Sequence, residues 1–207
     1  MRSRGNWSGE VESSRVNGER YEIELNIDAV HDDDGRISHF VGVFSDITSR
    51  KSTEKELLKL ANSDPLTELP NRSFFQASHS NLVRRATPHA LLCLDMDNFK
   101  KINDSLGHQT GDILIKQIAK RIQRMTDSNS TCYRLGGDEF SILMEDFSDI
   151  HTITHFAQSI LNTLSRPFII NKQEFVLGAS IGIALFPEDG SSPQELLKNA
   201  DTAMYFA

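Results

Sequence analysis

The sequence lacks any long apolar run. Its longest ones, such as residues 90–94 and 168–170, fall far short of the roughly 20 residues that a membrane-spanning helix needs. Cysteine is also scarce: Cys93 and Cys132 are the only two, and they stand in apolar segments without CxxC spacing. A disulfide framework or a cysteine-based zinc site is therefore excluded, and we expect two reduced thiols in the core of a cytoplasmic protein.

Basic residues are outnumbered, with 22 Lys and Arg against 29 Asp and Glu and a net charge of −7. Nucleic-acid binding depends on Lys and Arg that neutralise phosphates, so a nucleic-acid partner or a polymerase-like activity is disfavoured. Hydrophobic residues make up 38% of the chain, and long blocks of like charge are missing. The sequence therefore predicts a folded domain plus an additional segment, with little disorder.

The N-terminal segment has the pattern of a β-hairpin followed by a helix. Apolar and polar residues alternate over residues 21–29, and a second strand is expected at residues 37–44. The acidic run between them ends in Gly35 and indicates a hairpin turn rather than a metal site. Residues 49–61 are rich in helix formers, but their few apolar positions leave open whether this helix is a solvated linker or a dimerisation element.

Beyond residue 64 the pattern mixes strands and helices. We expect helices at residues 71–86, 111–125, 153–164 and 193–205, and strands at residues 90–96, 131–135, 140–144 and 175–186. The two strands on either side of Gly136 and Gly137 should form a hairpin. Because strands and helices do not strictly alternate, the predicted fold class is α+β, a sheet with helices on its faces.

Two acidic groups are candidates for chemistry. Asp95 and Asp97 follow an apolar strand and share one face, while Asp138 and Glu139 follow the glycine pair, where a ligand can approach the backbone. Carboxylates at strand ends suit Mg²⁺ bound together with substrate phosphates. A calcium-binding loop after Asp95 is excluded because its sixth position, Lys100, should be glycine. Two unrelated acidic surface loops remain the alternative.

Five segments in order resemble one known family. Residues 134–140, RLGGDEF, are similar to the signature of the GGDEF diguanylate cyclases. The other similar segments are DPLTELPNR at 64–72, DMDNFKKIND at 95–104, GHQTGD at 107–112, and the pair SIGIA at 180–184 and NADTAMY at 199–205. The resemblance covers residues 64–207 and implies a palm-like nucleotide-cyclase sheet flanked by helices.

The resemblance implies a transferase that condenses two GTP molecules into cyclic di-GMP, with one GTP held by each domain of a homodimer. By analogy Asp95, Asp138 and the Met96 carbonyl hold Mg²⁺, with Mn²⁺ as an alternative. Asp138 or Glu139 would help to deprotonate the attacking 3′-hydroxyl, and Lys100 would stabilise the charge that develops.

The same resemblance assigns substrate contacts. The backbone near Asn98 and Phe99 would bind phosphate, and Gly136 and Gly137 would let the nucleotide approach the hairpin. The positions that read guanine are matched by Asn103 and Asp112, with His108 beside them. Each has a plainer alternative: Asp112 as a charge at a helix N-terminus, Asn103 as a helix cap, and His108 as a turn residue.

Two departures from the family stand out. Many members carry an inhibitory product site, Arg-x-x-Asp, whose positions are occupied here by Asp127 and Ser130. The Arg124–Asp127 segment spells the motif three residues too early, so we expect no tight product inhibition there. The chain also stops at Ala207, before the Lys, Arg and last strand that the family pattern adds. We therefore expect a domain that lacks its C-terminal end and has weakened activity.

The segment WSGE at 7–10, leading to GVFSDIT at 42–48, is similar to the C-terminal half of a PAS sensor domain. The expected organisation is a partial PAS domain at 1–48, a linker helix at 49–63 and a GGDEF domain at 64–207. A parent protein could be anchored in a membrane upstream and could carry an EAL phosphodiesterase domain downstream. The competing hypothesis is a catalytically weak GTP-binding module that regulates such a phosphodiesterase. His151 and His155 lack the Glu of a zinc protease motif and are interpreted as part of an exposed helix face.

Overall fold

The computed structural model describes residues 5–206, which form two compact units that meet in the sequence between Lys59 and Leu60. The outer ends of the predicted segments 1–48 and 64–207, namely residues 1–4 and residue 207, lie outside the described residues. Each unit is described by itself below.

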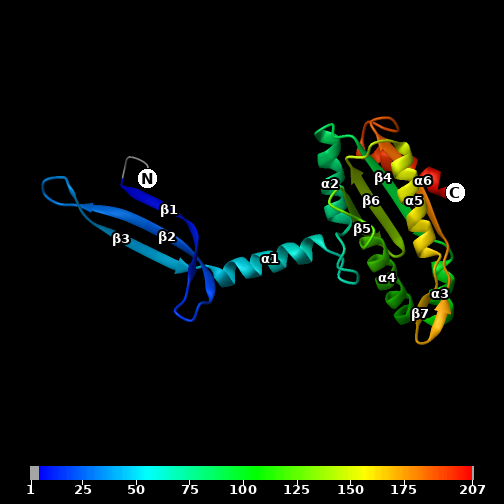
Figure 1. Ribbon diagram of the computed structural model, residues 1–207, viewed down its shortest axis with the longest axis horizontal. Coiled ribbons are helices and arrows are strands. Elements are labelled where there is room, and N and C mark those ends of the chain that lie inside the picture. The colour runs from blue at the N-terminus through cyan, green and yellow to red at the C-terminus, as the bar shows by residue number, and fades with distance from the viewer. Residues whose placement is uncertain (1–4, 207) are drawn as a thin grey trace. The chain divides into compact units, whose positions relative to one another are not determined.

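The N-terminal unit is an antiparallel three-stranded sheet in which β2 lies between β1 and β3 (Figure 1). Its strands are β1 (Asn6–Ser14), β2 (Arg20–His31) and β3 (Ile37–Asp46). The acidic run does form the turn between β2 and β3: the Asp32 carboxylate accepts hydrogen bonds from the backbone N–H groups of Asp34 and Arg36, at 3.1 and 2.9 Å. The sequence did not predict β1, because few of its residues are apolar.

Helix α1 (Thr48–Asn62) follows the sheet. It begins where the Asp46 carboxylate accepts a hydrogen bond from the Thr48 N–H at 3.0 Å. Lys51 in its first turns forms ion pairs with Glu10, at 2.6 Å, and with Glu22. None of the residues of α1 is buried, and these ion pairs, together with the buried Ile47 directly before the helix, hold its start to the sheet.

The C-terminal unit contains an antiparallel four-stranded sheet in the order β5-β6-β4-β9. These strands are β4 (His89–Met96), β5 (Ser130–Gly136), β6 (Glu139–Glu145) and β9 (Ala179–Phe186). The expected hairpin is present, because β5 and β6 pair across the Gly136–Gly137 turn. The α+β fold class is therefore confirmed, with a sheet flanked by helices (Figure 1).

Both faces of this sheet are covered by helices. Along β4, Leu91 and Cys93 pack with residues of α2 and α6, whereas Leu92 and Leu94 pack with residues of α4 and α5. The helices are α2 (Arg72–Arg84), α4 (His108–Gln123), α5 (Ile150–Leu164) and α6 (Pro193–Tyr205). Since both sides of β4 are buried, the strand is an almost continuous apolar run, which explains its sequence.

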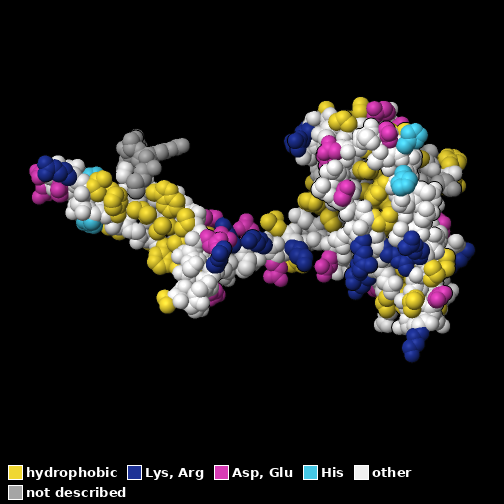
Figure 2. All heavy atoms as spheres, in the orientation of Figure 1, with side chains coloured by type: hydrophobic (Ala, Val, Ile, Leu, Met, Phe, Trp, Pro, Cys, Tyr) yellow, Lys and Arg dark blue, Asp and Glu magenta, His cyan; other side chains and the backbone are white. Residues whose placement is uncertain are grey.

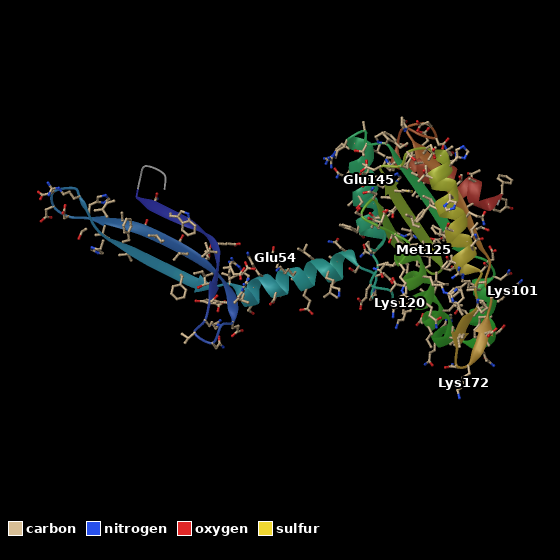
Figure 3. The ribbon with its side chains drawn as sticks, in the orientation of Figure 1. Glu54, Lys101, Lys120, Met125, Glu145 and Lys172 are labelled. Atoms are coloured by element: carbon tan, nitrogen blue, oxygen red, sulfur yellow. The ribbon has the colours of Figure 1, made fainter. Side chains whose placement is uncertain are left out.

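Three short elements, one helix and two strands, were not predicted from the sequence. Residues 99–106 form a separate helix, α3 (Phe99–Leu106), which is too short for periodicity to reveal. The single strand predicted at 175–186 is wrong: β8 (Gln173–Phe175) pairs with β7 (Phe168–Ile170) in a separate hairpin, and only β9 joins the main sheet. Lys172 lies at the tip of that hairpin (Figure 3), where Asn171 and Lys172 both have positive φ, as two-residue hairpin turns require.

The remaining compositional expectations concern cysteine and membranes. Cys93 and Cys132 are buried free thiols, as expected. Burial raises the pKa of Cys93 to about 12, so this thiol is protonated and unreactive at neutral pH. No helix in the described part of the chain is both long and apolar enough to cross a membrane.

Candidate active site

The β5–β6 hairpin has a turn that only glycine fits well. Gly136 has φ +145° and Gly137 has φ +53°, both in the region that L-residues with a side chain rarely adopt. The pairing shifts register between Arg134 and Gly136, which leaves Leu135 as the extra residue of a bulge. A Cβ added at either glycine would meet no atom within 4 Å, so the backbone conformation, not crowding within the chain, is the reason for these glycines.

Arg134 holds this turn from one side. Its guanidinium donates to the Gly137 carbonyl, at 2.9 and 3.2 Å, and to the Asp64 carboxylate at 2.8 Å. The side chains of the Arg134–Asp64 pair are only 11% and 17% exposed. Burial alone would raise the pKa of Asp64, but hydrogen bonds from Arg134 and Thr67 outweigh it and hold that pKa below its usual value. Asp64 therefore stays ionised and fixes the arginine.

Arg72, the first residue of α2, holds the turn from the other side. Its Nε donates to the carbonyl of the bulged Leu135 at 2.8 Å, and its NH2 donates to the Glu139 carboxylate at 3.2 Å. The sequence did not single out Arg72 or Arg134 as site residues. The available signal was their position, since Arg72 ends the segment DPLTELPNR and Arg134 begins RLGGDEF.

The two acidic groups predicted from the sequence lie close together. In the β4–β6 pairing Leu94 lies opposite Phe140, so Asp95, one residue further along β4, comes level with Glu139. Burial raises the pKa of Asp95, and the negative charges of Asp138, Glu139 and Asp97 raise it further. Unbalanced negative charge at one end of the sheet is the electrostatic condition that a bound cation relieves.

Asp97 is bound by the neighbouring strand β9 at Ser180, the residue that pairs with Asp95. Its carboxylate accepts a hydrogen bond from the Ser180 hydroxyl at 3.2 Å, and its backbone N–H donates to the Gly178 carbonyl at 3.0 Å. A Cβ at Gly178 would lie 2.2 Å from Asp97 Oδ2, so a larger residue there would displace the Asp97 carboxylate. Asp97 is thus held against β9, and Met96 before it is buried in the last pair of the β4–β9 ladder.

The loop after β4 leads into the N-terminus of α3, which has no side-chain cap. Asn98 precedes α3 with φ +59° and ψ +20°, and its side chain makes no capping hydrogen bond. Phe99 is buried in the core, whereas Lys100 is exposed. The first backbone N–H groups of α3 therefore have no side-chain cap, the state in which a helix N-terminus can receive an anion.

The predicted base-reading residues lie at the α3–α4 junction. Asn103 is inside α3 rather than at a cap, and its buried Oδ1 has no hydrogen-bond partner among the described residues. It lies against α4, because a Cβ at Gly111 would be only 1.9 Å from Asn103 Oδ1. Asp112 is exposed and follows the first turn of α4, so it is not the N-terminal charge proposed as its alternative. His108 is the exposed first residue of α4.

The remaining candidate groups behave as plain structural features. Asp127 accepts hydrogen bonds from Ser130 Oγ and the Asn129 N–H, both at 2.9 Å, so it closes its own turn. His151 and His155 are exposed on α5. Within residues 5–206, no group of three or more His, Cys, Asp or Glu side chains could hold a metal ion. A cation at Asp95 and Asp138 would therefore need backbone or substrate oxygens as further ligands.

Comparison with known proteins identifies the family. The profile described as "Diguanylate cyclase, GGDEF domain" matches residues 61–207. The chain is 40% identical over 164 residues to the bifunctional diguanylate cyclase/cyclic di-GMP phosphodiesterase MucR of Pseudomonas aeruginosa, an alignment that covers 77% of this chain and 24% of MucR. It spans only 21–35% of the length of the curated relatives that it matches.

Two solved structures are similar to the C-terminal unit. The GGDEF domain of TpbB (YfiN) from Pseudomonas aeruginosa aligns with a TM-score of 0.67 at 38% identity, covering 70% of this chain and 87% of that one. The coiled coil and GGDEF domain of DgcB from Caulobacter crescentus, solved in complex with c-di-GMP, aligns with a TM-score of 0.71 at 26% identity, covering 77% and 86%. On the match over residues 61–207, the chain belongs to the GGDEF diguanylate cyclase family.

Proposed function

We propose that the C-terminal unit is a diguanylate cyclase, which condenses two GTP molecules into cyclic di-GMP and two pyrophosphates in a dimer of two such units. The observation that carries this proposal is the group formed by Asp95, Asp138 and Glu139 beside the uncapped N-terminus of α3. A carboxylate group and an anion-accepting helix end are the two features that a metal-assisted phosphoryl transfer needs side by side.

The residues present fit a divalent cation. Asp95 and Asp138 would supply carboxylate oxygens and Met96 a backbone carbonyl. The pKa of Asp95 is raised by burial first and then by nearby negative charge, which a cation would balance. Mg²⁺ or Mn²⁺ bound there would lower the pKa of the 3′-hydroxyl and neutralise charge on the phosphate. We assign the cation to Asp138 rather than Glu139 because Glu139 already has a cationic partner in Arg72.

The other candidate residues would bind the phosphates, leave room for the nucleotide and neutralise charge during the reaction. The first N–H groups of α3, around Asn98 and Phe99, would bind the phosphates, and Lys100 would stabilise charge at the reacting phosphoryl group. Gly136 and Gly137 leave space over the hairpin for the nucleotide. Asp138 or Glu139 would accept the proton of the 3′-hydroxyl.

Guanine recognition is proposed at the α3–α4 junction. The orphaned Oδ1 of Asn103 is an acceptor, and the exposed carboxylate of Asp112 is another, whereas guanine presents donors at N1 and N2. His108 would lie beside the base. Adenine has no N1–H or N2 amine, so this pair of acceptors would favour GTP over ATP.

The test is product formation from GTP and Mg²⁺, measured by chromatography. We expect cyclic di-GMP from the unaltered chain and at least a 100-fold lower rate from Asp138→Ala, because the variant loses a metal ligand. Glu174→Ala, which removes an exposed carboxylate on β8, is the matched control and should be as active as the unaltered chain. Absence of product together with tight GTP binding would contradict the proposal and support the competing regulatory module.

We also propose that the N-terminal sheet is the C-terminal half of a PAS domain and that α1 transmits its state to the cyclase. Support comes from the three-stranded meander and the helix after it. Inserting one to four residues after Glu56 should change activity with the phase of the helix, since each inserted residue rotates the downstream part of the chain by about 100°. Activity that is independent of the insertion length would contradict this role.

A further inference from the structure

Asp97 carries a partly buried carboxylate that contacts the start of β9. Its Oδ1 accepts a hydrogen bond from the Ser180 hydroxyl at 3.2 Å, and its backbone N–H donates to the Gly178 carbonyl at 3.0 Å. The other carboxylate oxygen, Oδ2, occupies the space that a Cβ at Gly178 would fill. Side chain and backbone of Asp97 are therefore both bound by the short segment at residues 178–180.

No cation balances this carboxylate in the part of the chain that the structure describes. Arg72 and Arg134 form ion pairs with other carboxylates. Lys101 is exposed on the outer side of α3 (Figure 3), and Figure 2 shows other Lys and Arg side chains at the outer surface of this unit. A partly buried carboxylate without a cation lowers the stability of the fold, so stability does not explain why Asp97 lies here.

The residues on either side of Asp97 are those that the proposed reaction uses. Met96, directly before it, is proposed to offer its carbonyl to the cation, and Asn98 and Phe99, directly after it, are proposed to offer backbone N–H groups to phosphate. Asn98 has φ +59°, a left-handed conformation that costs free energy for a residue with a side chain. The Asn98 side chain makes no capping hydrogen bond, so Asp97 is the residue of this loop whose side chain ties it to the sheet.

We propose that Asp97 is a positioning residue: its contact with Ser180 holds the loop between β4 and α3 in the conformation that binds the cation and the phosphates. This inference rests on the proposed function. Ser180 suits the role because it pairs with Asp95 in the β4–β9 ladder and lies on the same face as that carboxylate. A hydroxyl has one proton to donate, and since Ser180 donates it to Asp97, the Asp95 oxygens stay free for a cation.

The test is binding of 3′-deoxy-GTP with Mg²⁺ to the whole chain, measured by isothermal titration calorimetry. This nucleotide lacks the attacking hydroxyl, so its affinity is measured without turnover. Asp97→Ala and Ser180→Ala each remove the contact and should each weaken binding by about tenfold or more. Because both remove the same contact, the double variant should bind no more weakly than either single one.

The hydrogen bond and the charge of Asp97 can be separated by the conservative variant. Asp97→Asn removes the charge but keeps a side-chain oxygen that accepts from Ser180. We therefore expect Asp97→Asn to bind 3′-deoxy-GTP within about threefold of the unaltered chain. Glu174→Gln, which removes the charge of an exposed carboxylate on β8, is the matched control and should bind like the unaltered chain.

Gly178→Ala tests the same contact without deleting any group. Its Cβ would lie 2.2 Å from Asp97 Oδ2 and would displace the carboxylate, so binding should weaken as in Ser180→Ala. The control is Gly42→Ala, whose Cβ would meet no atom closer than 3.8 Å. Urea unfolding of each variant separates a loss of affinity from a loss of the fold.

Three results would overturn the proposal. Unchanged affinity in Asp97→Ala and Ser180→Ala would show that the loop keeps its conformation without the contact, and cyclic di-GMP formed by the unaltered chain would then leave the proposed activity standing. Equal weakening in Asp97→Asn and Asp97→Ala would assign the effect to the charge instead of the contact. If the unaltered chain does not bind 3′-deoxy-GTP at all, this inference and the proposed function are both wrong.

Discussion

The two units contain the same kind of antiparallel sheet in different surroundings. In the C-terminal unit helices cover both faces of β4, and Leu91 and Leu92 on its two sides are both 0% exposed. In the described part of the N-terminal unit, only Ile23 and Ile47 are buried apolar residues. Strand pairing alone therefore does not build a core: a sheet needs a second layer to exclude water.

This difference also decides where chemistry can lie. A layered sheet can bury its centre and leave only the strand ends open, and the candidate site lies at those ends, where Asp95, Asp138 and Glu139 meet. The thin N-terminal sheet has no comparable protected end among its described residues. Its two faces differ: one carries Trp7, Leu25 and Phe44, and the other carries Glu22, Glu24 and Val43.

The largest effect is expected from a cavity in the layered core. Leu92→Ala removes a fully buried side chain from the central strand and should lower the free energy of unfolding by about 2–5 kcal/mol. Leu25→Ala in the N-terminal sheet should cost about 1 kcal/mol or less, because Leu25 is only partly buried. Urea unfolding monitored by far-UV circular dichroism reports mainly on the C-terminal unit. Fluorescence of Trp7, the only tryptophan, reports on the N-terminal one. If Leu92→Ala and Leu25→Ala lower the free energy of unfolding equally, the difference between the two units is wrong.

The second effect concerns Arg134, which holds the Gly136–Gly137 turn in place. Arg134→Ala removes the ion pair with Asp64 and the hydrogen bonds to the Gly137 carbonyl, which should cost about 2 kcal/mol. Because the turn positions Asp138, the proposed GTP condensation should slow at least tenfold. Arg124→Ala, at an exposed position after α4, is the control and should change neither quantity. Normal turnover by Arg134→Ala would show that the turn is fixed by its glycines alone.

The third effect is acid sensitivity of the layered unit. His79 and His89 are 2% and 0% exposed, their ring centroids are 5.2 Å apart, and the Nε2 atom of each lacks a partner among the described residues. Their facing groups are Phe75 and Phe186, the Thr87 carbonyl that accepts from His89 Nδ1, and Glu145, opposite His89 in the ladder (Figure 3). Burial, and secondly the charge of His89, lower the pKa of His79 to about 4, and burial lowers that of His89.

Both lowered pKa values make the folded chain less stable in acid. Below the ordinary histidine pKa of 6.5 the unfolded chain binds more protons than the folded chain. The free energy of unfolding therefore falls as the pH falls towards 4. From the lowered pKa of His79, which lines the groove between α2 and α6, we expect a loss of about 1–2 kcal/mol by about pH 4.5. His79→Leu should flatten this dependence, whereas His155→Gln on the exposed face of α5 should not. An unchanged acid transition in His79→Leu would contradict the assignment.

Sequence patterns predicted the parts of the fold that depend on one strand or helix at a time. The alternation around Ile23 and the continuous apolar run through Leu92 indicated β2 and β4, and the glycine pair indicated the β5–β6 hairpin. The break before β9 was missed: Gly178 contacts Asp97, which is far away in the chain, and no local sequence pattern contains this contact.

The sequence predicted the acidic residues of the candidate site but not the residues that hold them in place. Carboxylates at strand ends indicate a site by themselves, whereas the roles of Arg72 and Arg134 depend on which carbonyls they reach after folding. Asn103 is similar. Its orphaned Oδ1 results from the packing of α3 against Gly111, which becomes visible only when both helices are in place.

The smallest effect is expected for Val43, an exposed residue of the N-terminal sheet. Val43→Thr exchanges a methyl for a hydroxyl on the face that carries Glu22 and Glu24, where Val43 is 63% exposed and water already reaches the side chain. The change should alter the Trp7-monitored unfolding free energy by no more than about 0.5 kcal/mol. If Val43→Thr instead costs as much as Leu25→Ala, the face that carries Val43 must be covered in solution. The N-terminal sheet would then be layered like the C-terminal one, and the contrast between the two units would disappear.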